Sequence, residues 1–118
     1  MGYKFQELQV YKISLEYLDQ IYALAKKLPE TEKFNLRTQI QRAATSVVLN
    51  IAEGSTGQRD PEQGRFLGLA SRSFLETVAC FDIMIRRKYF QENELRVVKD
   101  LGNQLFMKLQ AFKKAIRT

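Results

Sequence analysis

The residues best suited to chemistry lie in the stretch NIAEGSTGQRDPEQG, residues 50–64, where two glycines frame a serine and a threonine. Such a stretch could cradle a phosphate group with its backbone N–H groups. A Walker loop, however, needs the spacing G-x-x-x-x-G-K-[ST] after a strand. Here the two glycines are three residues apart, no lysine follows them, and a helical pattern precedes them. We therefore interpret the stretch as a connection between two helices.

This connection carries signals for the end of one helix and the start of the next. Gly54 follows the first helical pattern directly, and we predict that it takes the left-handed conformation that commonly ends a helix. Asp60 and Pro61 predict the next helix start, with Asp60 as the N-cap and Pro61 at the first helical position.

The chain has no histidine and one cysteine, Cys80. Histidine-based acid–base catalysis, Ser-His-Asp or Cys-His pairs and the usual zinc sites are therefore excluded. Carboxylates such as Glu53 and Glu76 remain, but nothing beside them supplies a nucleophile or a metal. We predict a protein that is not an enzyme and that binds no metal or cofactor.

The same composition bears on the compartment. A single cysteine cannot form a disulfide within the chain and is typical of a reducing environment. The N-terminus has no apolar segment of the signal-peptide type, and no apolar run approaches the roughly 18 residues of a membrane span. We expect a cytoplasmic protein with no membrane partner.

The elements that position these residues are predicted to be helices. The chain has 118 residues, of which 45% are hydrophobic, so it can form one domain, residues 1–118, around a single core. Apolar residues recur at helical spacing in four segments, about 5–28, 32–53, 61–88 and 92–116, and no segment alternates like a strand. Because the connections are short, we predict an all-α, antiparallel up-down-up-down four-helix bundle.

The second segment shows the core pattern most clearly. One of its faces carries six apolar residues, which we expect to be buried: Leu36, Ile40, Ala43, Ala44, Val47 and Ile51.

Some large apolar residues are predicted to point away from the core of this bundle. At 100° per residue they lie on the outer sides of three of the four helices: Leu49, Leu75, Ile83, Phe106 and Met107. Outward apolar residues on several helices favour contacts between subunits, so we predict a homo-oligomer.

A polar stripe borders the core face of the second segment, and two polar residues border that of the third. The six residues are Arg42, Ser46, Asn50 and Glu53, followed by Ser73 and Glu76. They could be solvated surface. If they face a second subunit they must be paired, because a buried unpaired charge costs several kcal/mol. We favour a structural hydrogen-bond network over an active site.

The positive charge is concentrated near the C-terminus. Residues 1–83 carry ten basic and ten acidic residues, whereas residues 84–118 carry nine basic and three acidic ones, which accounts for the whole net charge of +6. Candidate phosphate contacts are Arg86, Arg87, Lys88, Arg96, Lys99, Lys113, Lys114 and Arg117. Tyr89 and Phe90 follow the first three and could stack on bases of single-stranded nucleic acid. A solvated helix face is the alternative interpretation.

The sequence also resembles a known family. The resemblance begins with Phe5-x-x-Leu8-x-Val10-Tyr11 and continues through Leu28-Pro29, Phe34-x-Leu36 and Gln39-Ile40-x-Arg42-Ala43-Ala44-x-Ser46. Its most specific part is Asn50-Ile51-Ala52-Glu53-Gly54, and Phe66-Leu67 and Ala70-x-x-Ser73-x-x-Glu76 follow. These motifs are similar to those of the four-helix bundle proteins associated with intervening sequences in bacterial 23S ribosomal RNA genes, the S23 ribosomal protein family.

The resemblance implies a non-enzymatic bundle that assembles as a homopentamer and whose biochemical role is poorly defined. Two positions depart from the family pattern. Val48 stands where the family usually has a proline, and the arginine that follows the glycine is displaced to Arg59.

We therefore expect a homo-oligomeric protein that binds nucleic acid, with RNA favoured over DNA, through its basic C-terminal part. The alternative is a scaffold or accessory subunit whose partner is another protein and which has no direct role with nucleic acid.

Overall fold

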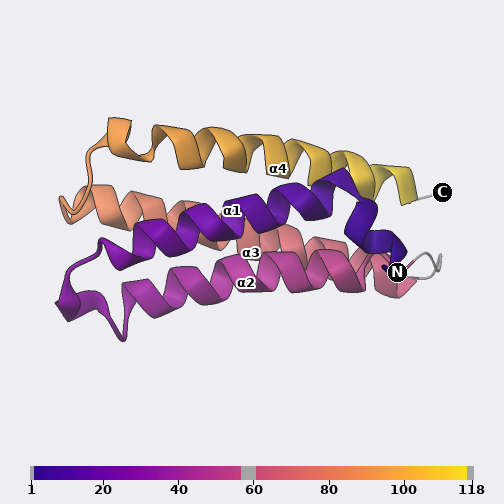
Figure 1. Ribbon diagram of the computed structural model, residues 1–118, viewed down its shortest axis with the longest axis horizontal. Helices are drawn as coiled ribbons and strands as arrows, with labels where there is room; N and C mark the ends of the chain where they lie inside the picture. The colour runs from indigo at the N-terminus through magenta and orange to yellow at the C-terminus, as the bar shows by residue number, and fades with distance from the viewer. Residues whose placement is uncertain (1, 57–60, 117–118) are drawn as a thin grey trace.

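The computed structural model describes residues 2–56 and 61–116, and within these ranges the chain is helical with no strand. Four long helices, α1 (Gln9–Lys26), α2 (Leu36–Glu53), α3 (Pro61–Arg86) and α4 (Arg96–Ile116), lie side by side in a body of 44 × 24 × 24 Å (Figure 1). Helix α1 packs against α2 and α4, and α3 packs against the same two helices. In the part of the chain that is described, no helix is long and apolar enough to cross a membrane.

Three of the long helices begin later than the sequence pattern predicts, because a 3₁₀ turn precedes each of them. These turns are η1 (Lys4–Glu7), η2 (Glu30–Glu32) and η3 (Glu92–Leu95). Leu8 is extended, with φ −71° and ψ 134°, and separates η1 from α1. Hydrophobic periodicity does not distinguish a short 3₁₀ turn from the first turn of an α-helix, so the expected starts at 5, 32 and 92 were too early.

The core lies along the common axis of the four helices. All six residues expected on the inner face of α2 are buried. The largest fully buried side chains on the other helices include Tyr17, Ile21, Leu67, Phe81, Met84, Leu105 and Leu109.

One hydrogen bond between side chains crosses this apolar core from α1 to α3. The Tyr17 hydroxyl lies 2.7 Å from Thr77 Oγ1, and both residues are almost completely buried. Thr77 Oγ1 donates its only proton to the Phe74 carbonyl at 2.6 Å, so the Tyr17 hydroxyl is the donor to Thr77. Burial raises the pKa of Tyr17 well above its ordinary value, which keeps this proton in place.

Gly54 ends α2, but not in the predicted left-handed conformation. Its φ of −79° and ψ of 0° are accessible to any residue, and its N–H continues the helical ladder to the Asn50 carbonyl. The close approach of α3 explains the glycine instead. A Cβ atom here would lie 2.7 Å from Leu67 Cγ and 3.1 Å from the Gln63 carbonyl oxygen.

Among the described residues, the start of α3 agrees with the prediction from the sequence. Pro61 is the first residue of the helix. The predicted N-cap Asp60 and the displaced Arg59 lie outside the described residues. The buried Gln63 side chain donates to the Gly54 carbonyl at 3.4 Å and so links the two helix ends.

Candidate nucleic-acid interface

The basic residues Arg86, Arg87 and Lys88 are exposed at the end of α3. The Lys88 N–H bonds to the Ile85 carbonyl and the Tyr89 N–H to the Met84 carbonyl, each at 2.9 Å. This pair of bonds is a Schellman motif, which requires a left-handed residue that is usually glycine. Lys88 occupies that position with φ 65°. The turn thus presents a lysine at a position where the backbone favours glycine.

No ion pair neutralises these three cations among the residues that the structure describes. The ion pairs that do form nearby join Glu30 to Lys33 and Arg37, and Glu92 to Lys99. Exposed cations without an ion-pair partner can exchange water and counterions for phosphate groups.

The two aromatic residues predicted to stack on bases are not available for that role. Phe90 is buried in the core, with 8% of its surface exposed. Tyr89 is partly buried, and its hydroxyl donates to Glu32 Oε2 at 2.6 Å. The prediction of base stacking by these residues was therefore wrong, because both rings complete the packing under the helix end.

This hydrogen bond also stabilises the ionised form of the Glu32 carboxylate. The bond from the Tyr89 hydroxyl, and after it the bond from the Leu36 N–H, hold the pKa of Glu32 below its ordinary value. The positive charge of Arg87 acts in the same direction with a smaller effect. The connection between α1 and α2 therefore lies directly against the turn between α3 and α4.

The remaining predicted phosphate contacts are distributed along α4. Arg96 is exposed in the first turn, whereas Lys99 Nζ is bonded to Glu92 Oε1 at 2.8 Å. Lys113 is partly buried and Lys114 is exposed in the last turn. Given a rise of about 1.5 Å per residue, these two lie about 26 Å further along the helix than Arg96. The predicted contact Arg117 lies outside the described residues. The basic residues thus form an elongated surface and not a single cluster.

The predicted polar network exists in part and joins α2 to α3. The Asn50 side-chain amide donates to the carbonyl and to the hydroxyl of Ser46, at 2.9 and 3.0 Å, and the Ser73 hydroxyl donates to Ser46 Oγ at 2.8 Å. Separately, Gln39 Nε2 donates to Glu76 Oε2. Within the described ranges of this single chain, Arg42 and Glu53 take part in no hydrogen bond or ion pair, and the expectation that they pair across a second subunit stays a prediction.

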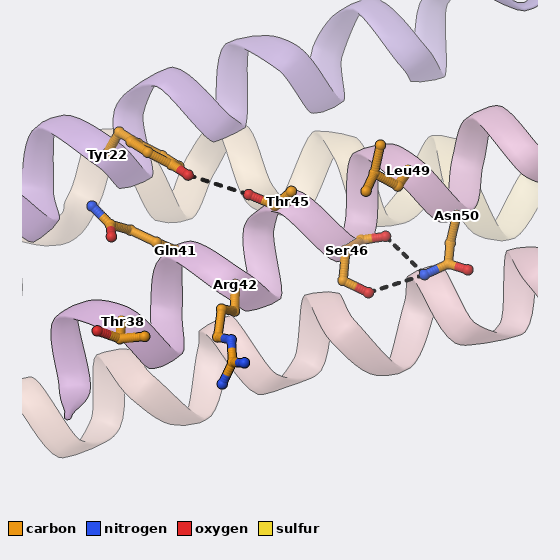
Figure 2. Close-up of a pocket in the computed structure, with 8 residues that line it drawn as sticks. All are labelled: Tyr22, Thr38, Gln41, Arg42, Thr45, Ser46, Leu49 and Asn50. Carbon is orange, nitrogen blue, oxygen red and sulfur yellow. Dashed lines mark hydrogen bonds between the residues drawn. The ribbon is translucent and has the colours of Figure 1, made fainter. Parts of the chain in front are cut away.

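A shallow pocket of about 440 Å³ lies beside this network, between α1 and α2. Figure 2 shows the pocket, with Tyr22 and Thr45 joined at 3.4 Å and the Arg42 guanidinium directed away from them. The pocket holds a cation, amides and hydroxyls but no carboxylate or thiol. It offers a guanidinium, amides and hydroxyls that can hydrogen-bond a polar partner.

The cysteine is unsuited to chemistry. Cys80 is buried, and burial together with the nearby Glu76 charge raises its pKa to about 11, which disfavours the reactive thiolate. Across the described residues, no group of three or more His, Cys, Asp or Glu side chains is placed to hold a metal ion.

Four of the five outward apolar residues are exposed as predicted, and they are Leu49, Leu75, Ile83 and Met107. The predicted exposure of Phe106 was wrong, because this residue is partly buried and its ring stacks on Phe74 with ring centroids 5.1 Å apart. Among the described residues the most exposed large apolar one is Phe34, which is 89% exposed in the connection before α2 and is not among the predicted outward residues. Its signal was an aromatic residue in a short polar segment between a proline and the next helix.

Fold and surface together define an all-helical bundle with a polar network between two helices and unpaired cations at one end. The sequence matches the family described as 23S rRNA-intervening sequence protein over residues 6–111, and the chain belongs to this family. The match confirms the resemblance carried by the Asn50–Gly54 motif.

A solved structure supports the same assignment. The chain is similar to a protein of unknown function from the S23 ribosomal protein family of Bacteroides thetaiotaomicron, known from its crystal structure. The two share 26% identity with a TM-score of 0.80, over 89% of this chain and 95% of the other. No curated protein matches the sequence.

Proposed function

We propose that the protein is a non-enzymatic, cytoplasmic homo-oligomer of four-helix bundles with up-down-up-down connectivity that binds nucleic acid, RNA by preference. The surface is formed by the α3–α4 turn and α4. The observation that carries the proposal is the run of three exposed cations, Arg86 to Lys88, none of which has an ion-pair partner among the described residues. The family description, which refers to an intervening sequence of 23S rRNA, supports RNA as the ligand.

The proposal predicts a salt-dependent affinity for RNA. Binding of a fluorescently labelled RNA, followed by anisotropy, should weaken steeply between about 50 and 200 mM salt, because each phosphate contact releases counterions. Replacing Arg86, Arg87 and Lys88 with alanine should lower the slope of log K against log[salt] by up to about 2 if all three contact a single strand.

A matched control removes the same charge elsewhere. Lys4, Lys12 and Arg72 are exposed and lie outside the proposed surface. Their triple alanine variant has the same net charge as the first variant and should keep most of the affinity and slope. Equal losses in the two variants would show that only net charge matters, and no binding by the wild type at low salt would reject the proposal.

The oligomeric part of the proposal is supported by the exposed residues Leu49, Leu75, Ile83 and Met107 on the sides of the helices. By resemblance to the family we propose a pentamer. Sedimentation velocity should give a mass of about five chains for the wild type, and Leu75→Glu should reduce it. A wild-type protein that sediments as a single chain would contradict this part of the proposal and leave RNA binding to be judged separately.

A further inference from the structure

Phe34 is almost completely exposed, although it lies among well-packed elements. The residue is 89% exposed in the segment between η2 and α2, while Leu36 two residues later is buried. Lys33 Nζ lies 5.5 Å from the centroid of the Phe34 ring. In the free protein this ring gains no stabilisation from burial. A partner that covers it would supply that burial, and the residues around the ring indicate the chemistry of such a partner.

The surroundings of Phe34 belong to the basic end of the bundle. Figure 1 shows the α1–α2 connection and the α3–α4 turn at the same end of the molecule, opposite both termini. The bond from Tyr89 to Glu32 joins the two segments, and Asn35 and Arg87 line one groove of about 430 Å³. The segment that holds Phe34 therefore lies at the same end of the bundle as Arg86, Arg87 and Lys88, more than 50 residues away in the sequence, and its next residue, Asn35, shares a groove with Arg87.

The charge around Phe34 selects among possible partners. The cores of protein–protein interfaces are depleted in lysine, whereas this ring has Lys33 beside it and Lys88 on the turn at the same end, where three cations have no ion-pair partner among the described residues. The nearby carboxylates are already bonded within the protein, Glu30 to Lys33 and Arg37, and Glu32 to Tyr89. An exposed aromatic ring among cations is the arrangement that binds single strands, in which bases stack and phosphates pair with the cations.

We propose that Phe34 is a stacking platform for an unpaired base of the bound nucleic acid, whose phosphates contact Arg86, Arg87 and Lys88. This inference rests on the proposed function and makes it more specific. A duplex keeps its internal bases stacked on one another and offers a face to Phe34 only at its two ends, so the site prefers a single strand or an unpaired loop. The position of Lys88 in the left-handed region, where glycine would be favoured, is consistent with a charge kept there for contact.

The test compares a single-stranded RNA with a blunt duplex of the same length, each carrying 2-aminopurine to report stacking. Phe34→Ala should weaken single-strand binding by roughly 5- to 150-fold, the range for loss of one base–aromatic stack. It should abolish the protein-dependent change in 2-aminopurine fluorescence. Duplex affinity and the salt slope should stay unchanged, because no charge is removed.

Two variants serve as matched controls. Phe34→Tyr keeps the ring and should restore single-strand affinity. Tyr3→Ala removes another aromatic ring that is 73% exposed, in the N-terminal segment, and should have no effect. Circular dichroism should show the same helical content for every variant, because both rings are exposed.

The outcomes separate this inference from the proposed function. If the wild type binds RNA and Phe34→Ala weakens neither form, or weakens both equally, the stacking site is wrong while nucleic-acid binding stands. If the wild type binds neither form, the proposed function fails and this inference fails with it. If Phe34→Ala instead lowers the mass in sedimentation, Phe34 is a contact between copies, which also overturns the stacking site.

Discussion

The close packing of Gly54 against α3 predicts a cost for adding a single methyl group. In Gly54→Ala the new carbon would lie 2.7 Å from Leu67 Cγ and 3.1 Å from the Gln63 carbonyl oxygen. Leu67 is fully buried, so it cannot move aside into solvent. Overpacking of this kind costs about 1–3 kcal/mol.

The backbone acts in the opposite direction. The φ of −79° at Gly54 suits alanine, and the lower entropy of the unfolded alanine chain stabilises the folded state by up to about 1 kcal/mol. We therefore expect a net destabilisation of up to about 2 kcal/mol, which for a chain of this length lowers Tm by up to about 8 °C.

A double-mutant cycle in urea, at fixed protein concentration, measures the interaction directly. Leu67→Ala alone should cost about 2–5 kcal/mol, because it leaves a cavity. In that background Gly54→Ala should cost little, which gives a coupling energy of at least about 1 kcal/mol. Gly68→Ala is the control, since a Cβ at this glycine meets nothing within 4 Å and should stabilise α3 by up to about 1 kcal/mol. Additive effects, or a stabilising Gly54→Ala, would refute the steric explanation.

Three further predictions concern the basic turn, the buried hydroxyl pair and acid stability. Lys88→Gly should raise stability by about 1 kcal/mol in thermal unfolding by relieving the left-handed backbone, whereas Lys88→Ala should not, and both should weaken RNA binding equally. Thr77→Val should cost about 1–3 kcal/mol in urea because it leaves the buried Tyr17 hydroxyl without an acceptor, and adding Tyr17→Phe should recover much of this loss. Because the pKa of Glu32 is lowered in the folded state, its contribution to stability is present above the ordinary value of 4.5 and is lost as the pH falls below it. Urea unfolding between pH 3 and 7 should therefore show a weaker pH dependence in Tyr89→Phe, and identical profiles would contradict this cause.

The helices and much of the core could be predicted from the sequence because a 3.6-residue period is a local signal. All six residues on the inner face of α2 are buried because that face is apolar over five turns. Exposure of Leu49 and Met107 followed from the same geometry. Phe106 did not, because its ring reaches round the helix to stack on Phe74, and the direction of the Cα–Cβ bond does not reveal that reach.

The features of the candidate site that escaped prediction depend on contacts between distant segments. Tyr89 and Phe90 follow the basic run in the sequence, yet the fold turns both rings inward and brings Phe34 to the same end from another connection. The sequence around Gly54 predicts a left-handed conformation, because glycine most often serves that purpose at a helix end. Only the position of Leu67 on α3 shows that space, and not conformation, requires the glycine.

The hydroxyl pair in the core has a consequence for how the bundle closes. Burial of apolar surface is non-directional, so the apolar pattern by itself distinguishes less sharply than a polar pair between helix offsets of one turn, about 5.4 Å. Tyr17 and Thr77 are 60 residues apart and meet in only one of these offsets. A displaced α1 would leave both hydroxyls in an apolar interior without each other. The pair therefore selects a single alignment of the N-terminal and C-terminal helix pairs, and its bond forms only when the two halves dock.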